Sequence, residues 1–244
     1  IRVEAAGYAG RTINLRIYRE KININLMPMS EYEKFIRIKE SERKAFSSEE
    51  LVGILKLYYS ISDKMEYEPL VLAIARVMLK LSYIEGWSRW ESKLKLVQNK
   101  LREFDYDFYV YSFLKVIDGF YVFDICRNSS DLKGLQSCNR AAELLSRGQK
   151  IFSSKDIPQE YSDISITELM TVAIARSYEI AGCIKKNEGL DYSREVRKAK
   201  AVWENSDFLP IPNPTNPLKP FENPYRKMKD IHLSYLANDE PCIL

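Results

Sequence analysis

The sequence predicts an all-α fold in which antiparallel helical hairpins stack as a short α-solenoid or bundle. Three observations lead to this prediction. Apolar residues recur at spacings of three and four over most of the chain. Helix-start signals recur about every 34 to 44 residues, which is the period of a helix–turn–helix array. The composition is that of a globular protein, with 45% hydrophobic and 29% charged residues and only 9 glycines among 244 residues.

The first segment, residues 1–29, is predicted to be an extended, strand-like arm. Apolar and polar residues alternate at Ile13, Leu15 and Ile17, and the alternation resumes in a shifted phase at Ile22. A period of two is typical of an extended strand. Because an isolated two-stranded ribbon is only marginally stable in water, we expect the arm to pair with this domain or with a neighbour.

The middle segment, residues 30–206, is predicted to be helical. Ser48 and the two glutamates after it form a helix start, Pro69 opens the next helix, and Gly86 ends that helix. An apolar stripe with alternating spacings of three and four then covers Trp87–Leu101.

Four further helices are predicted in this segment. Their approximate ranges are Phe108–Ile125, Leu132–Leu145, Ser165–Ile180 and Asp191–Trp203. The first of them is aromatic on all sides, which is typical of a helix buried in a core or between subunits. Paired helices of this kind cannot bury their apolar faces alone, so we expect neighbouring hairpins to pack together.

The last segment, residues 207–244, is predicted to be an extended Pro-rich tail. It holds seven of the ten prolines, and proline at this density disfavours helix. Apolar residues punctuate the tail, so we expect it to lie on a partner surface. The candidate partner contacts are Phe208, Ile211, Phe221, Tyr225 and Tyr235.

The four cysteines form no C-x-x-C pair, which argues against a zinc or thioredoxin motif. Cys126 and Cys138 flank a polar segment that contains the N-glycosylation sequon Asn128-Ser129-Ser130. A disulfide and a glycan here would describe a secreted protein. Two reduced thiols on helix faces and a chance tripeptide are the other interpretation, which the low cysteine content favours.

The chemistry-bearing motifs point away from catalysis. The single histidine, His232, cannot supply a metal site or a catalytic pair that needs two imidazoles. The sequence contains no nucleophile elbow, Walker loop or dinucleotide-binding glycine pattern. We therefore expect no catalytic residue, no cofactor and no metal. No apolar run reaches the roughly 20 residues of a membrane span, so no transmembrane segment is expected.

Net charge is too even for an unaided nucleic-acid binder, with 37 Lys and Arg against 34 Asp and Glu. Two predicted helices nevertheless carry short basic faces that could contact phosphates. The candidate RNA contacts are Arg89, Lys93 and Lys100 on one helix and Arg194, Arg197 and Lys198 on the other. The alternative is that these cations only line the solvent-facing sides opposite Trp90 and Trp203.

The segment FSSEELVGILKLYY, at Phe46–Tyr59, is followed by a proline-initiated helix with Leu70, Ala73, Ile74 and Met78. This stretch resembles the organellar helical-hairpin repeat proteins, the octotricopeptide and heptatricopeptide arrays often found with RAP domains. The resemblance covers one and a half hairpins, and the rest of the chain matches by spacing only. It implies a mitochondrial or plastid location and binding to RNA or ribonucleoprotein. No functional residue carries over, because the repeat pattern defines packing positions.

We therefore expect a non-enzymatic structural subunit of a large mitochondrial assembly. The mitochondrial ribosome is the first expectation, with other subunits and ribosomal RNA as partners. An accessory subunit of a respiratory-chain or ATP synthase complex is the alternative, which the near-neutral charge suits better. A secreted helical protein with a Cys126–Cys138 bridge is the third, and an enzyme the last.

Overall fold

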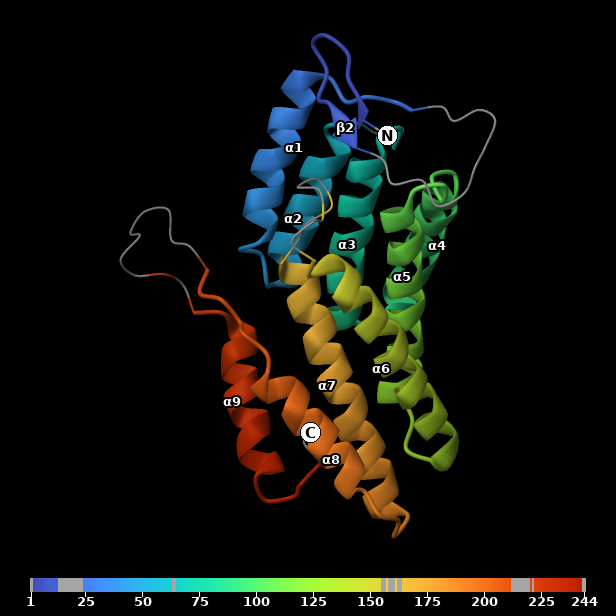
Figure 1. The fold of residues 1–244 in the computed structure, drawn as a ribbon, viewed down its shortest axis with the longest axis vertical. Helices are drawn as coiled ribbons and strands as arrows, with labels where there is room; N and C mark the ends of the chain where they lie inside the picture. The colour runs from blue at the N-terminus through green and yellow to red at the C-terminus, as the bar shows by residue number, and fades with distance from the viewer. Residues whose placement is uncertain are drawn as a thin grey trace. The chain divides into compact units, whose positions relative to one another are not determined.

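A computed structural model confirms the all-α fold (Figure 1). It describes residues 2–12, 24–62, 65–154, 157, 161, 164–211, 220 and 222–242. Those residues form nine helices and one short two-stranded sheet. The chain divides into two units, and each is described by itself. The first comprises residues 1–117 and 151–163, and the second comprises residues 118–150 and 164–244.

The first unit contains four consecutive helices that pack as hairpins. They are α1 (Met29–Glu42), α2 (Ser48–Tyr59), α3 (Glu68–Glu85) and α4 (Trp87–Arg102). Each helix contacts the next, and α1 also contacts α3. Every residue from Leu70 to Ser82 on α3 is buried, so α3 forms the centre of this unit.

Local sequence signals set the bounds of these helices. Ser47 and Glu50 form a capping box at the start of α2, one residue before the predicted start. Pro69 lies in the first turn of α3. Gly86 separates α3 from α4 at a φ of 96°, which a residue with a side chain rarely adopts. The predicted stripe of α4 is confirmed, because its members are buried: Trp87, Trp90, Leu94, Val97 and Leu101.

Five helices follow. They are α5 (Phe108–Arg127), α6 (Leu132–Phe152), α7 (Ile164–Asn187), α8 (Ser193–Glu204) and α9 (Pro224–Leu236). In the second unit α7 packs on α8 and α8 packs on α9. The side chain of Leu145 on α6 packs closely on Gly119 of α5, where a Cβ atom would lie 2.9 Å from Cδ2 of Leu145.

The N-terminal arm pairs with itself. Strands β1 (Arg2–Val3) and β2 (Arg11–Thr12) are antiparallel, and Tyr8 forms a bridge with Pro28. The predicted extended character is therefore found where the arm is described. The alternating residues on which the prediction depended, from Ile13 to Ile22, lie outside the described residues.

The prediction of an extended tail is wrong over Pro224–Leu236, which forms α9. Proline is tolerated in the first turn of a helix, where the missing N–H has no intrahelical partner to lose. Asn223 caps this helix, and its side chain accepts a hydrogen bond from the backbone N–H of Tyr225. No further proline follows until Pro241, so the helix can continue for 13 residues.

Candidate functional site

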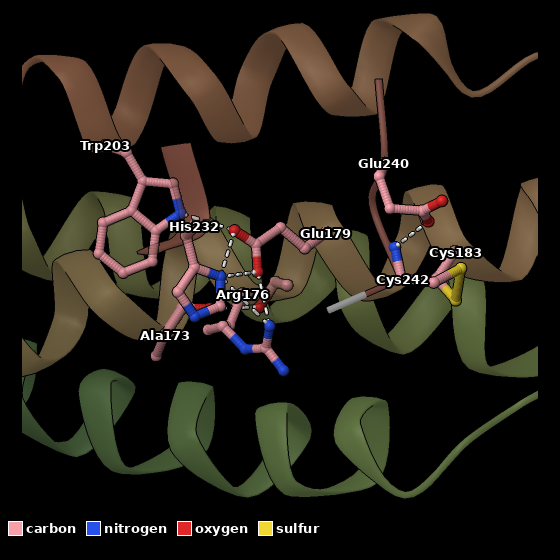
Figure 2. A network of polar contacts seen from close by, with 9 residues as sticks. Ala173, Arg176, Glu179, Cys183, Trp203, His232, Glu240 and Cys242 are labelled. Carbon is pink, nitrogen blue, oxygen red and sulfur yellow. Dashed lines mark hydrogen bonds and ion pairs between the residues drawn. A yellow bond between two sulfur atoms is a disulfide. The ribbon is translucent and has the colours of Figure 1, made fainter. Parts of the chain in front are cut away.

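Several polar contacts of the second unit converge on the carboxylate of Glu179 on α7 (Figure 2). This side chain is fully buried. The indole N–H of Trp203 donates to Oε1 at 2.6 Å, and Nδ1 of His232 lies 3.0 Å from Oε1 and 2.9 Å from Oε2. Arg176 pairs with Oε2 at 2.7 Å. One carboxylate therefore joins side chains from α7, α8 and α9.

The only histidine of the chain, His232, belongs to this Glu179 cluster and lies in the core of the second unit. The His232 ring stacks on Trp203 with a centroid separation of 5.1 Å and an angle of 26°. His232 is buried, and both oxygens of Glu179 already have partners. A general acid or base must reach the proton that it transfers. The arrangement instead suits a structural tie, in which a buried charge is matched by charged and polar partners.

The first unit has a comparable centre at Glu42, on the last turn of α1. Its fully buried carboxylate accepts from Arg76 Nε and from Lys80 Nζ, both at 2.7 Å. The hydroxyl of Tyr58 on α2 donates to it at 2.9 Å. Because Arg76 and Lys80 both lie on α3, this carboxylate links the first three helices of the unit.

A third buried carboxylate, Glu68, fixes the arm. Arg11 on β2 pairs with it, and the hydroxyl of Tyr161 donates to its other oxygen. The ring of Tyr161 stacks on Tyr109 at a centroid separation of 5.0 Å. The predicted arm is thus anchored to its own unit by an ion pair.

Two disulfides use all four cysteines. Cys126 near the end of α5 is bonded to Cys138 on α6, which is the pairing that the sequence left open. Cys183 on α7 is bonded to Cys242 in the C-terminal segment, 59 positions away in sequence. Nothing in the sequence indicates this second pair, because neither cysteine stands in a motif.

The first predicted basic face lies on α4, and its cations have partners on α4 or at its two ends. Arg89 pairs with Glu85 at 3.1 Å while its side chain stays 70% exposed. The ammonium of Lys93 lies 4.5 Å from the ring centroid of Trp90. Lys100 pairs with a glutamate three residues ahead at 2.7 Å. Acidic and aromatic neighbours therefore moderate the charge that this face presents.

The second predicted basic face lies on α8. The ammonium of Lys198 lies 4.9 Å from the ring centroid of Tyr178. The positive charge of Arg194 also acts on Tyr178, where it favours the ionised hydroxyl. Burial raises the pKa of the Tyr178 hydroxyl, against the opposing effect of Arg194. The backbone N–H of a serine lowers the pKa of the exposed Asp191, and Arg197 contributes to the same effect.

The predicted partner contacts of the tail fall into two groups. Phe208 and Ile211 are buried by this chain itself, and Phe208 packs against a core tryptophan and against Tyr225. The prediction is therefore wrong for these two side chains, which pack in the core of their own unit and not against a partner. Tyr235 is 48% exposed, and its role as a partner contact stays a prediction. Phe221 lies outside the described residues.

The described surface includes a groove in each unit. A groove of about 350 Å³ lies beside the arm, and its polar lining comes mainly from Tyr8, Asn25, Glu66 and Tyr67. A second groove, of about 490 Å³, is lined by Val122, Gln136, Ser137, Asn139, Arg140 and Glu143. Neither groove is lined by a member of the three buried clusters.

The described residues contain no cluster of three or more side chains suited to hold a metal ion. In the same part of the chain, no helix has the length and apolar character that a membrane crossing requires. Comparison of the chain with protein-family models, with curated proteins and with solved structures found no match. The resemblance to organellar hairpin-repeat proteins therefore stays a prediction.

Proposed function

We propose that this chain is a non-enzymatic helical protein that acts by binding other proteins, and that it works in an oxidising compartment of the secretory route. The observation that carries the proposal is the pairing of all four cysteines in two disulfides. Disulfides persist in secreted and cell-surface proteins and are rare where glutathione and thioredoxin keep thiols reduced. This is the third of the expectations drawn from the sequence, and it now has the strongest support.

The buried polar clusters support a structural rather than a catalytic use of the acidic side chains. Glu42, Glu68 and Glu179 are each fully buried and each bonded to groups from other elements. Such networks fix the relative placement of helices when their members are satisfied.

Exposed apolar side chains support a binding role. In the second unit Tyr121 and Ile125 lie one turn apart on α5 and are 46% and 39% exposed, and Leu132 at the start of α6 is 49% exposed. Ile231 and Tyr235 are spaced in the same way on α9, at 46% and 48%. Apolar and tyrosine side chains grouped on a surface are typical of protein–protein contacts.

The second candidate is a structural subunit of a mitochondrial assembly, either the ribosome or a respiratory-chain or ATP synthase complex. The exposed cations favour it, because Arg89, Arg194 and Arg197 all face solvent and could meet phosphates. In this candidate the chain would bind RNA together with neighbouring subunits.

The test is the redox state of the native protein. The full chain is purified from its source after rapid alkylation, and non-reducing peptide mapping identifies Cys126–Cys138 and Cys183–Cys242. Recovery of both linked peptides supports the proposed compartment, and alkylated thiols at both pairs overturn it. Sedimentation with ribosomes that nuclease or high salt abolishes would favour the second candidate instead.

A further inference from the structure

We propose that Asn128 carries an N-linked oligosaccharide, an inference that rests on the proposed secretory location. Asn128, Ser129 and Ser130 form the turn between α5 and α6. No other Asn in the sequence is followed by a residue other than proline and then by Ser or Thr. The turn that holds this single sequon lies at the end of the α5–α6 hairpin (Figure 1).

The turn exposes to solvent the acceptor Asn128 and the hydroxyl residue Ser130 of the sequon. Asn128 and Ser130 are exposed, whereas Ser129 between them is half-buried. The backbone of Gly134 explains this alternation, because a Cβ atom at that position would lie 2.2 Å from Cβ of Ser129. The middle residue of the sequon therefore packs inward, and its neighbours stay accessible.

The acceptor amide keeps its local contact after modification. Nδ2 of Asn128 donates one hydrogen bond, to the carbonyl of Asp124 at 2.8 Å. An amide nitrogen has two hydrogens, and glycosylation replaces one of them. The remaining N–H can still donate to Asp124, so a sugar at this position does not require the end of α5 to unravel.

The covalent step needs a lipid-pyrophosphate-linked oligosaccharide as donor and the transferase of the secretory route. Nδ2 of Asn128 attacks C1 of the first sugar, and a C–N bond forms as the bond from C1 to the pyrophosphate oxygen breaks. The lipid pyrophosphate leaves with the bonding electrons, and the amide proton passes to a base of the transferase. No oxidant or reductant is consumed.

A disulfide lies next to the sequon. Cys126 lies two residues before Asn128, and its bond to Cys138 closes a short loop around the sequon.

Native full-length protein tests the proposal. Peptide N-glycosidase in ¹⁸O water converts a glycosylated Asn128 to labelled aspartate, and the intact protein gains mobility on the same treatment. We expect both results from disulfide-bonded protein. Unmodified Asn128 in protein whose two disulfides are formed would overturn this inference and leave the proposed compartment standing. Unmodified Asn128 together with free thiols would overturn both.

Variants of the full chain, expressed through the secretory route, test whether the sequon is the site. Asn128→Gln and Ser130→Ala should each abolish the mobility shift. Ser129→Ala is the matched control, because its position in the sequon tolerates any residue except proline, and it should keep the shift. A shift that persists in Ser130→Ala contradicts the assignment.

Discussion

Trp203 on α8 donates its indole N–H to Glu179 on α7 at 2.6 Å, inside the core of the second unit. His232 on α9 meets the same carboxylate and stacks on the same indole ring. Glu179, Trp203 and His232 thus connect α7, α8 and α9 of this unit. The chain's single histidine, which lies in the segment predicted to be an extended tail, is part of this connection.

Removing the contacts between Glu179, Trp203 and His232 should lower the stability of the second unit. Glu179→Leu leaves buried partners without their acceptor, and we expect a loss of about 3 to 5 kcal/mol in the free energy of unfolding. Trp203→Phe keeps an aromatic ring and removes one donor, so about 1 to 3 kcal/mol is expected. Urea titration, with hydrogen exchange read on peptides of α7 to α9, measures both. Equal stability of the two variants would contradict the role given to Glu179.

The Glu42 centre should behave in the same way in the first unit. Glu42→Gln removes the charge that Arg76 and Lys80 share, and leaving those cations buried should cost about 3 to 5 kcal/mol. Glu91→Gln is the control, since it breaks an exposed i,i+4 pair with Lys95 and should cost less than about 1 kcal/mol. Urea unfolding followed through the exchange protection of α1 to α3 distinguishes them. If Glu91→Gln were as unstable as Glu42→Gln, burial would not be the reason that the ion pairs of Glu42 stabilise the protein.

Much of the fold follows from local signals. The buried stripe of α4 is visible as spacing, and the starts of α2 and α3 are visible as Ser47–Glu50 and Pro69. Helix α9 had a signal that proline density concealed, namely Asn223 followed directly by Pro224, a cap followed by a first-turn proline.

The buried clusters could not be predicted from the sequence, because their partners come from distant elements. Glu179 and His232 are 53 positions apart, and Cys183 and Cys242 are 59 apart. One local hint exists in Arg76 and Lys80, which stand four residues apart inside an apolar helix. Charges in such a run must find a buried partner or reach solvent, but the spacing does not name Glu42 as the partner.

The two disulfides should differ in what they stabilise. In the chain-entropy view, the Cys183–Cys242 bond closes the longer loop and contributes about 4 kcal/mol, against about 3 kcal/mol for Cys126–Cys138. Replacing Cys183 and Cys242 by Ala should therefore lower the melting temperature more than replacing Cys126 and Cys138. It should also raise hydrogen exchange in the C-terminal segment, because that bond anchors the segment to α7.

Reduction of the wild-type chain is the control for these cysteine variants. It should lower the melting temperature more than either pair of alanine replacements, because it opens both bonds at once. Deletion of residues 210–244 should likewise destabilise the second unit, because Ile211 and His232 belong to its core. Unchanged helix content and melting after this deletion would restore the original prediction of a tail that serves only a partner.

The capping box of α2 should give a pH-dependent contribution. The backbone N–H groups of Ser47 and Phe46 hold the pKa of the Glu50 carboxylate below its ordinary value. A lowered folded-state pKa stabilises the protein above the unfolded pKa, and this contribution is lost as the pH falls through the folded pKa. Glu50→Gln should therefore be less stable than wild type at neutral pH, and the difference should shrink on acidification. Melting curves from pH 7 down to the acid limit check the sign.

Ser47→Ala, which removes the other half of the capping box, should lower the free energy of unfolding by about 1 kcal/mol.

Two helical glycines give a matched test of packing. Glycine in a helix interior is unfavourable by roughly 0.5 to 1 kcal/mol relative to alanine, so Gly53→Ala, with no heavy atom within 4 Å of the added Cβ, should stabilise the protein by about that amount. Gly119→Ala gains the same preference but places Cβ 2.9 Å from Cδ2 and 3.0 Å from Cγ of the fully buried Leu145. Overpacking of this kind costs about 1 to 3 kcal/mol, so we expect a net loss.

Thermal and urea unfolding of Gly53→Ala, Gly119→Ala and the double variant measure these effects. The sites are remote from each other in the sequence and share no contact, so the double variant should show the sum. If α5 and α6 approach at Gly119 as closely as the structure has it, Leu145→Ala should relieve the clash. The pair Gly119→Ala and Leu145→Ala would then lose less stability than the two single variants added together. Strict additivity of that pair would mean that the Leu145 side chain does not limit the residue at position 119.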